Sequence, residues 1–278
     1  MSETSDVKIK SLMLMGLAAM FAFVSSCATV SHNTNSSTVL HGDNIESFLD
    51  SVVIVQPTPE SLCSGVFISE NEILTAGHCV SYQDEIIIMG FVLHIPSERS
   101  PIGRSISIIT HDWYMEDRTL EEVIPTQFEV ISYSEDADLA LLRCSGENCP
   151  TDVSFINVAR RTDDGIGRPA YVLGHPAGML YTLSDGVFSR APETQDGIDY
   201  AFATTDIWFG DSGGPIVDRR GRLVGITSAM VGSSGMPVSH LGLFIYITTI
   251  REFLDGRTEF SEPEVVEELI LEGDPSED

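Results

Sequence analysis

Gly210-Asp211-Ser212-Gly213-Gly214-Pro215 is the stretch on which the interpretation of this 278-residue sequence depends. Because glycine lacks a Cβ, a serine between glycines can be held on a tight, exposed turn. The backbone N–H groups of Gly210 and Ser212 can then point at one spot, as is needed to hold a developing oxyanion. A serine hydroxyl alone is a weak nucleophile, so we expect a base elsewhere in the chain.

Two stretches upstream of this serine offer the base and a residue to orient it. They are Thr75-Ala76-Gly77-His78-Cys79 and Asp138-Leu139-Ala140-Leu141-Leu142, so that His78, Asp138 and Ser212 follow one another 60 and then 74 residues apart. In this order the three stretches resemble the motifs of the chymotrypsin/trypsin-like serine protease superfamily, and those of bacterial trypsin-like peptidases in particular. Subtilisin-like enzymes have the order Asp, His, Ser, and α/β-hydrolases have the order Ser, Asp, His.

The resemblance covers roughly residues 51–256 and implies an all-β fold, with two six-stranded antiparallel β-barrels of the chymotrypsin type and a short C-terminal helix. It also implies a serine endopeptidase that acts on a protein or peptide substrate and needs no metal or organic cofactor. Ser212 is the expected nucleophile, His78 the base and Asp138 its orienting partner, with the N–H groups of Gly210 and Ser212 as the oxyanion hole.

The distribution of apolar residues predicts the same fold class without the resemblance. Short apolar or alternating segments with turn residues between them, and no long helical pattern, are typical of a β-barrel. A closing helix is predicted over residues 248–254. The predicted strands form a first set, 51–55, 63–68, 72–76, 86–89, 91–95, 103–110, 123–133 and 138–143, and a second set, 170–173, 182–189, 200–205, 214–217, 223–228 and 243–248.

Residues 1–27 have the pattern of a secretion signal, in which two lysines precede the apolar run 12–24. That run is too short to span a hydrocarbon core of about 30 Å, although a transmembrane anchor is the alternative. Its end, Val24-Ser25-Ser26-Cys27, resembles the lipobox of bacterial lipoproteins. The resemblance implies that Cys27 is acylated and anchors the exported protein at a cell-envelope membrane, with secretion without a lipid as the alternative.

Three further segments complete the predicted organisation. Residues 28–50 are rich in Ser, Thr and Asn and are predicted to be a flexible linker, residues 51–258 are the predicted protease domain, and residues 259–278 are a predicted acidic tail. A weak apolar stripe in the tail leaves a short helix as an alternative. The formal net charge of −27 argues against nucleic acid as a partner, because phosphates would be repelled.

The sequence contains five cysteines, of which four remain if Cys27 carries lipid. The resemblance implies a disulfide between Cys63 and Cys79 that fixes the histidine turn to a neighbouring strand. Cys144 and Cys149 are close enough in sequence for a local disulfide, although two free thiols are the alternative. An even number of pairing cysteines suits an oxidising compartment.

Substrate preference is only weakly encoded. Asp206 lies six residues before Ser212, where trypsin-like enzymes place the acid at the base of the specificity pocket, which would favour Arg or Lys before the cleaved bond. Bacterial relatives often begin this strand with a Thr-Asp pair instead, and Thr205-Asp206 also fits that pair. Met230 and Phe244 stand where the pocket walls of trypsin-like enzymes need glycine, which argues against a deep open pocket. The preference is therefore left open.

Two residues near the predicted site need their own account. In zymogen-activated relatives the aspartate before the serine pairs with a freed α-amino group. No Lys or Arg occurs from residue 11 to residue 98, so this activation route is not expected, and the sequence does not identify another partner for Asp211. Gly174-His175-Pro176-Ala177-Gly178 resembles a turn of bacterial relatives, and His175 is not expected to be the base because it follows Asp138 in the chain.

Two other function classes are compatible with these residues. A protease-like binding or chaperone module would have the same fold with little or no catalysis, and labelling of Ser212 by a fluorophosphonate separates it from an enzyme. An esterase would use the same triad on small acyl substrates, and comparing the turnover of peptide and ester substrates separates it from an endopeptidase.

Overall fold

The structure is a computed structural model that describes residues 43–59, 61–88, 91–111, 123–158, 162–233 and 236–256. The predicted signal with Cys27, residues 28–42 of the predicted linker and the predicted acidic tail lie outside these ranges. Among the described helices, none is both long and apolar enough to cross a membrane.

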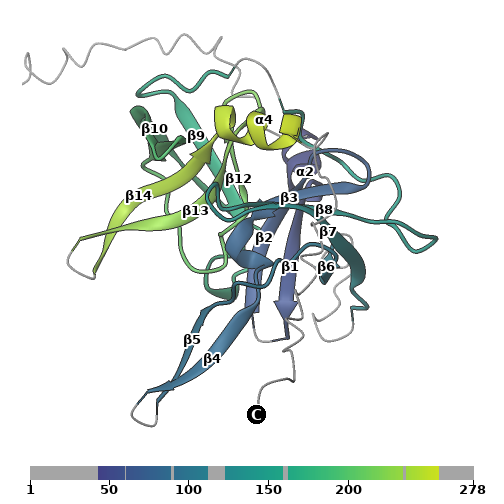
Figure 1. The fold of residues 1–278 in the computed structure, drawn as a ribbon. Helices are drawn as coiled ribbons and strands as arrows, with labels where there is room; N and C mark the ends of the chain where they lie inside the picture. The colour runs from purple at the N-terminus through teal and green to yellow at the C-terminus, as the bar shows by residue number, and fades with distance from the viewer. Residues whose placement is uncertain are drawn as a thin grey trace, which may run out of the picture. The chain divides into compact units, whose positions relative to one another are not determined.

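Six antiparallel strands form the first barrel (Figure 1). They are β1 (Val52–Thr58), β2 (Ser61–Phe67), β3 (Glu72–Ala76), β6 (Ser105–Ile109), β7 (Thr126–Ser134) and β8 (Leu139–Arg143). The barrel closes in the order β1-β2-β3-β8-β7-β6, because β1 pairs with β2 along one edge and with β6 along the other. β8 lies between β3 and β7 and is buried from Leu139 to Leu142, which explains its nearly continuous apolar sequence.

A second set of six antiparallel strands forms the other barrel, in the order β10-β11-β14-β13-β12-β9. The strands are β9 (Pro169–Gly174), β10 (Thr182–Gln195), β11 (Ile198–Ala203), β12 (Pro215–Asp218), β13 (Leu223–Ser233) and β14 (Met236–Tyr246), and they are followed by the helix α4 (Ile247–Asp255). The predicted fold class is therefore confirmed: two closed six-stranded antiparallel barrels with a short C-terminal helix.

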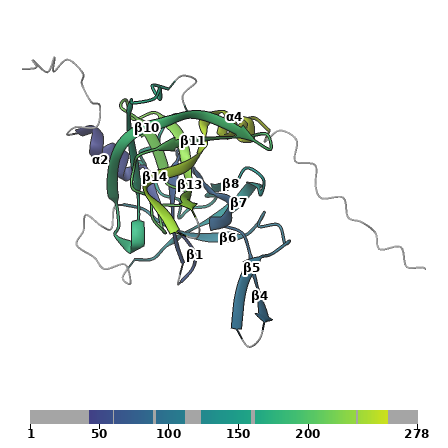
Figure 2. The same cartoon turned by 90° about the vertical axis from the view of Figure 1, so that its left-hand side faces the viewer.

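Two strands of the first predicted set do not belong to a barrel. β4 (Gln83–Ile88) and β5 (Phe91–Pro96) pair with each other as a separate two-stranded sheet. Both views show this hairpin extending away from the barrels (Figures 1 and 2). The prediction of strands here was correct, but apolar alternation alone does not say which neighbour a strand pairs with.

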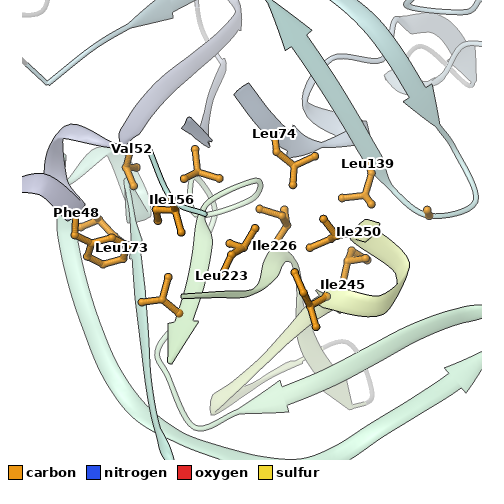
Figure 3. Packing of buried hydrophobic residues seen from close by; sticks show 14 residues of the cluster. Phe48, Val52, Leu74, Leu139, Ile156, Leu173, Leu223, Ile226, Ile245 and Ile250 are labelled. Carbon is orange, nitrogen blue, oxygen red and sulfur yellow. The ribbon is translucent and has the colours of Figure 1, made fainter. Parts of the chain in front are cut away.

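The structure also differs from the predicted linker at its end, where the helix α2 (Asp43–Asp50) forms. Phe48 is the reason, because its side chain is only 5% exposed and packs in the same apolar cluster as Val52 and Leu173 (Figure 3). The hydroxyl of Ser51 donates a hydrogen bond of 2.7 Å to the Phe48 carbonyl at the end of the helix. The ordered domain thus begins before residue 51.

One apolar cluster joins the two barrels (Figure 3). Leu74 and Leu139 from the first barrel, Ile226 and Ile245 from the second and Ile250 from α4 are all buried in it. Burial of apolar surface in one shared cluster holds the two barrels against each other. The turns that carry the predicted site residues come from both barrels, so this packing determines how they meet.

Candidate active site

His78 lies on the short 3-10 helix η1 (Gly77–Cys79), directly after β3. The Gly77 N–H donates a hydrogen bond of 2.8 Å to the Asp138 carbonyl, and Cys79 is joined by a disulfide to Cys63 on β2. An added Cβ on Gly77 would lie 3.0 Å from the Leu139 nitrogen, a tight contact, so glycine favours this close approach of the two chain segments. The histidine turn is therefore fixed to both of its neighbouring strands.

His78 and Asp138 form a close pair. Nδ1 of His78 lies 3.0 Å from both carboxylate oxygens of Asp138, and the His78 backbone N–H donates to Oδ1 at 2.8 Å. The hydroxyl of Ser228 donates to Oδ2 of the same carboxylate at 2.6 Å. This arrangement leaves Nε2 of His78 as the ring nitrogen available for proton transfer.

The pair shifts the pKa values of both residues. Burial alone would lower the pKa of His78, but the hydrogen bond and the negative charge of Asp138 raise it above the usual value. Burial alone would raise the pKa of Asp138, but the hydrogen bonds from His78 and Ser228 and the charge of His78 lower it. Asp138 is therefore ionised at neutral pH, and it stabilises a protonated His78.

Ser212 lies beside this pair on the turn before β12. Its carbonyl accepts a hydrogen bond of 2.8 Å from the Ser64 N–H, which ties the turn to the first barrel. The Ser212 hydroxyl donates to the Ser228 carbonyl at 3.4 Å, and within the described residues it makes no hydrogen bond with His78. Ser228 thus contacts both Ser212 and Asp138. The structure brings the three predicted residues to one place, with the serine hydroxyl rotated toward Ser228.

The segment before Ser212 is held so that two N–H groups remain available. The Phe209 carbonyl accepts a hydrogen bond of 2.7 Å from the Ala177 N–H, and the Gly210 carbonyl accepts one of 2.7 Å from the Ser64 hydroxyl. Neither the Gly210 N–H nor the Ser212 N–H donates to another described residue. Gly210 has a φ of +105°, and an added Cβ would overlap the His175 carbonyl, so this position requires glycine.

Asp211, whose partner the sequence did not identify, is only 2% exposed. Its carboxylate accepts hydrogen bonds from the backbone N–H groups of Trp208, at 2.8 Å, and of His175. Burial outweighs these two bonds and raises the pKa of Asp211 to about 7. Gly174, the first residue of the turn at residues 174–178, leaves room for this carboxylate, because an added Cβ would overlap Oδ1 of Asp211.

His175 is fully buried and does not take part in the pair with Asp138. Its Nδ1 accepts a hydrogen bond of 3.0 Å from the Tyr181 N–H, and its ring packs edge-to-face on that of Tyr181. Burial lowers the pKa of His175 to about 4, so the imidazole is neutral at physiological pH. His175 contributes to the site through its backbone N–H, which binds the Asp211 carboxylate, and not through its ring.

Two of the residues predicted for the specificity pocket have clear positions in the structure. The side chain of Asp206 is 69% exposed, its carboxylate pairs with Nδ1 of His240 at 2.7 Å, and it lines a cavity together with Ile207 and Trp208. Phe244 is not a pocket wall but is fully buried against Phe188 in the core of the second barrel. Gly242 lies two residues before Phe244 on β14, and an added Cβ there would overlap the side chain of Ile207.

Met230 pairs with Gly242 across β13 and β14, while its side chain lies outside the described part of the chain. The register between β13 and β14 is interrupted between Thr227 and Ala229, so that Thr227 faces Phe244 and Ala229 faces Leu243. Ile207 packs against Gly242 and lines the same cavity as Asp206.

The cysteines are paired as Cys63–Cys79 and Cys144–Cys149. Cys63, His78 and Cys79 are near enough to one another to suggest a metal site by distance alone. The two sulfurs are bonded to each other, however, so they offer no thiolate ligands.

Comparison with known proteins identifies the family of this chain. Residues 63–226, more than half of the chain, match the family model described as the trypsin-like peptidase domain. Protease Do-like 1, chloroplastic, of Arabidopsis thaliana is 28% identical over 152 residues, which are 51% of this chain and 33% of that protein. A probable periplasmic serine endoprotease DegP-like of Pseudomonas putida is 27% identical over 184 residues, which are 65% of this chain and 31% of that protein. The chain thus spans about a third of the length of these curated relatives.

Two solved structures illustrate the shared fold. The HtrA-type protease AlgW with tripeptide has a TM-score of 0.55 at 23% identity, over 77% of this chain and 62% of that one. The Rv3671c protease, inactive form, has a TM-score of 0.55 at 18% identity, over 77% of this chain and 92% of that one. At these identities the likeness shows the fold alone. Together with the matched family model, it establishes that the chain belongs to the trypsin-like peptidase domain family.

Proposed function

We propose that the protein is a serine endopeptidase that hydrolyses peptide bonds through Ser212, His78 and Asp138. The observation that carries the proposal is the His78–Asp138 pair, in which Nδ1 is bound at 3.0 Å and Nε2 is left available beside the Ser212 turn. The available N–H groups of Gly210 and Ser212 support the same proposal, because they suit a tetrahedral oxyanion.

The proposed reaction has two halves. In the first, His78 Nε2 takes the proton of the Ser212 hydroxyl as Oγ attacks the substrate carbonyl. The N–H groups of Gly210 and Ser212 bind the oxyanion, and His78 then gives its proton to the leaving amine, which leaves an acyl-enzyme on Oγ. In the second half, water gives a proton to His78 and attacks the acyl carbon, and the carboxylic acid product leaves as Ser212 regains its proton.

One small movement is required before this reaction. The Ser212 hydroxyl must rotate from the Ser228 carbonyl toward His78, which a change of its χ1 rotamer accomplishes. Catalytic hydrogen bonds are often long or misaligned without substrate and tighten in the Michaelis complex. The weak 3.4 Å bond to Ser228 is easily exchanged.

For the residue before the cleaved bond, we propose a preference for small uncharged side chains over Arg and Lys. The apolar side chain of Ile207 packs against Gly242, next to Asp206 in the chain, and suits an uncharged substrate residue. Asp206, the acid that would attract a basic side chain, is instead exposed and paired with His240. Cleavage profiling with a peptide library tests this preference, and a majority of cuts after Arg or Lys would contradict it.

We further propose that the protein is exported and acts at a bacterial cell envelope, held there by a lipid on Cys27. The signal-like residues 1–27, the paired cysteines and the relatives named as periplasmic support export. Mass spectrometry of the mature N-terminus, compared with a Cys27→Ser variant, tests the lipid. A mature chain without acyl groups would favour plain secretion.

The test of catalysis is labelling by a fluorophosphonate together with hydrolysis of a casein-derived peptide. The wild-type protein is expected to do both, and Ser212→Ala is expected to lose labelling and to lose several orders of magnitude of activity. Ser145→Ala, which changes an exposed serine outside the site, is the matched control. Hydrolysis that persists in Ser212→Ala would remove the proposal, and failure of the wild-type protein to label would favour the binding-module alternative.

A further inference from the structure

One arginine side chain binds the backbone that follows the histidine turn. Arg104 lies directly before β6, and its Nη1 donates hydrogen bonds of 2.7 Å to the Val80 carbonyl and 2.8 Å to the Ser81 carbonyl. Its Nη2 donates a third hydrogen bond, of 3.0 Å, to the Pro57 carbonyl on β1. One guanidinium therefore joins the chain just after His78 to two strands of the first barrel.

The bonds to Val80 and Ser81 reach the end of η1 itself. The N–H groups of both residues donate to the Gly77 carbonyl, at 3.1 and 3.2 Å, so the two residues form the turn that ends this short helix. Their N–H groups are thus bound to Gly77 and their carbonyls to Arg104. A helix this short has few internal hydrogen bonds, so its orientation depends on contacts of this kind from outside.

The shape of the arginine side chain suits this task. A guanidinium presents five N–H donors in a planar fork and can bind several carbonyls at once, whereas the lysine side chain has a single nitrogen. The guanidinium of Arg104 also lies over the ring of Tyr82, with Cζ 4.6 Å from the ring centroid. This cation–π contact limits the ways in which the fork can turn.

The His78 side chain is 48% exposed, so packing around the imidazole does not by itself fix its direction. The direction depends on the pair with Asp138 and on the backbone that carries the ring. Before His78, the Gly77 N–H is bound to the Asp138 carbonyl, and directly after it Cys79 is joined to Cys63. The hydrogen bonds of Arg104 hold the next two residues of the same turn.

We propose that Arg104 is a positioning residue for His78, which holds η1 so that the imidazole keeps the geometry needed for proton transfer. The proposal rests on the proposed endopeptidase function. A misplacement of about 1 Å typically costs about 10²-fold in rate. Loss of Arg104 is therefore expected to lower kcat and to change KM little, because the base acts in the chemical step.

Steady-state kinetics on a short peptide tests the proposal. Arg104→Ala is expected to lower kcat about 10²-fold and to leave KM within about twofold of the wild-type value. Arg104→Lys keeps the charge without the fork, so its kcat should also fall, by about tenfold or more. Urea unfolding of each variant shows whether it is folded under the conditions of the assay.

Arg99→Ala is the matched control. The exposed Arg99 lies over the same Tyr82 ring, with Cζ 4.1 Å from the centroid, but within the described residues its side chain makes no hydrogen bond to Val80 or Ser81. The control therefore removes a positive charge and a cation–π contact at this place without removing the proposed restraint. It should keep the kinetics of the wild-type protein.

Added guanidinium tests whether the missing hydrogen bonds are the cause of the loss. Guanidinium chloride at millimolar concentration should restore part of the kcat of Arg104→Ala, whereas sodium chloride at the same concentration should not. Neither salt should raise the kcat of Arg99→Ala.

NMR titration of the His78 ring, in the Ser212→Ala background, separates positioning from a change of charge. The Asp138 carboxylate raises the pKa of His78, so an imidazole displaced from this pair in Arg104→Ala should titrate at a lower pKa. Loss of a nearby positive charge would by itself raise the pKa of His78, which is the opposite sign. In Arg99→Ala the pKa should not fall.

Several results would overturn the proposal. They are an unchanged kcat in Arg104→Ala, full activity in Arg104→Lys, and equal losses in Arg104→Ala and Arg99→Ala. A loss of kcat that guanidinium does not restore, together with a pKa of His78 that does not fall, would also overturn it. If the wild-type protein neither labels with a fluorophosphonate nor cleaves a peptide, the endopeptidase function fails, while the titration still decides whether Arg104 positions His78.

Discussion

The Ala177 N–H donates a hydrogen bond of 2.7 Å to the Phe209 carbonyl, and this contact determines which way the next N–H group faces. In a trans peptide the C=O and the N–H point in opposite directions. With the Phe209 carbonyl held toward Ala177, the Gly210 N–H points away from Ala177 and stays free of that hydrogen bond. The orientation of the proposed oxyanion hole is thus set from the turn at residues 174–178.

Gly210→Ala is predicted to disrupt this orientation. The added Cβ would overlap the His175 carbonyl, so the Phe209–Gly210 peptide must move and its N–H is lost from the oxyanion site. Loss of one such donor typically lowers kcat about 10² to 10³-fold. Steady-state kinetics on a peptide substrate measures the effect.

Gly221→Ala is the matched control for Gly210→Ala. Gly221 also has a positive φ, +70°, but nothing lies within 4 Å of an added Cβ there. Gly221→Ala therefore introduces backbone strain of about 1–2 kcal/mol but no steric overlap, and the variant should keep its activity. Similar losses of activity in the two variants would show that strain, rather than displacement of the peptide, is responsible.

Asp211→Asn is predicted to change how stability depends on pH. Burial raises the pKa of Asp211 to about 7, so the folded state binds this proton more tightly than the unfolded state. The associated stability is fully present below the unfolded pKa near 4 and is lost as the pH rises through about 7. The uncharged amide does not titrate, so the variant should gain stability relative to the wild-type protein between pH 4 and pH 8.

Urea unfolding of the two proteins at pH 4, 6 and 8 measures this gain. Comparing the difference between variant and wild type at each pH cancels the other titrating groups, which both proteins share. A difference that is the same at all three pH values would mean that the carboxyl group of Asp211 does not titrate in this range.

Asp138→Asn is predicted to lower the pKa of His78. Its pKa is raised by the hydrogen bond and the charge of Asp138 against the opposing effect of burial, so without the carboxylate burial prevails. NMR titration of the His78 ring, in the Ser212→Ala background, measures the shift. With Ser212 present, kcat is expected to fall by about 10⁴-fold, as is usual for this change in a Ser-His-Asp triad.

The control for Asp138→Asn is Asp206→Asn, which removes a carboxylate that pairs with a different histidine, His240. The pKa of His78 should remain where it is in that variant. A similar change of the pKa in both variants would point to the overall field of the protein and not to the direct pair.

Ile207→Ala is predicted to widen the range of residues accepted before the cleaved bond. Removing the side chain that packs on Gly242 opens space beside β14. Bonds that follow a residue larger than Val should therefore be cleaved more efficiently. Peptide-library profiling of the variant beside the wild-type enzyme measures the change. An unaltered profile would place the determinants of the preference elsewhere.

The order of three motifs predicted the two-barrel fold correctly, because residues from both barrels are needed to bring His78, Asp138 and Ser212 together. The individual strands were also largely predictable from apolar alternation. The burial of Phe244 in the barrel core was not, since it depends on the register of β13 and β14, which is interrupted between Thr227 and Ala229, and a bulge has no clear signature in a single sequence.

Two other features were hidden for different reasons. Residues 43–50 are mostly polar, and one buried side chain, Phe48, is enough to dock them as a helix. The partners of Asp211 are backbone N–H groups of Trp208 and His175, which sequence identity does not reveal. The turn at residues 174–178 was noted for its resemblance, but its contact with the oxyanion segment required the structure.

The cluster shared by the two barrels makes the halves of the domain dependent on each other. In an isolated N-terminal half, Leu74 and Leu139 would be exposed to water. In an isolated C-terminal half, the same would hold for Ile226, Ile245 and Ile250. A chain severed in the segment that connects the barrels should therefore yield two inert fragments, and co-expressing them should restore hydrolysis by reassociation. If one fragment were already present, synthesis of the other would then start the hydrolysis.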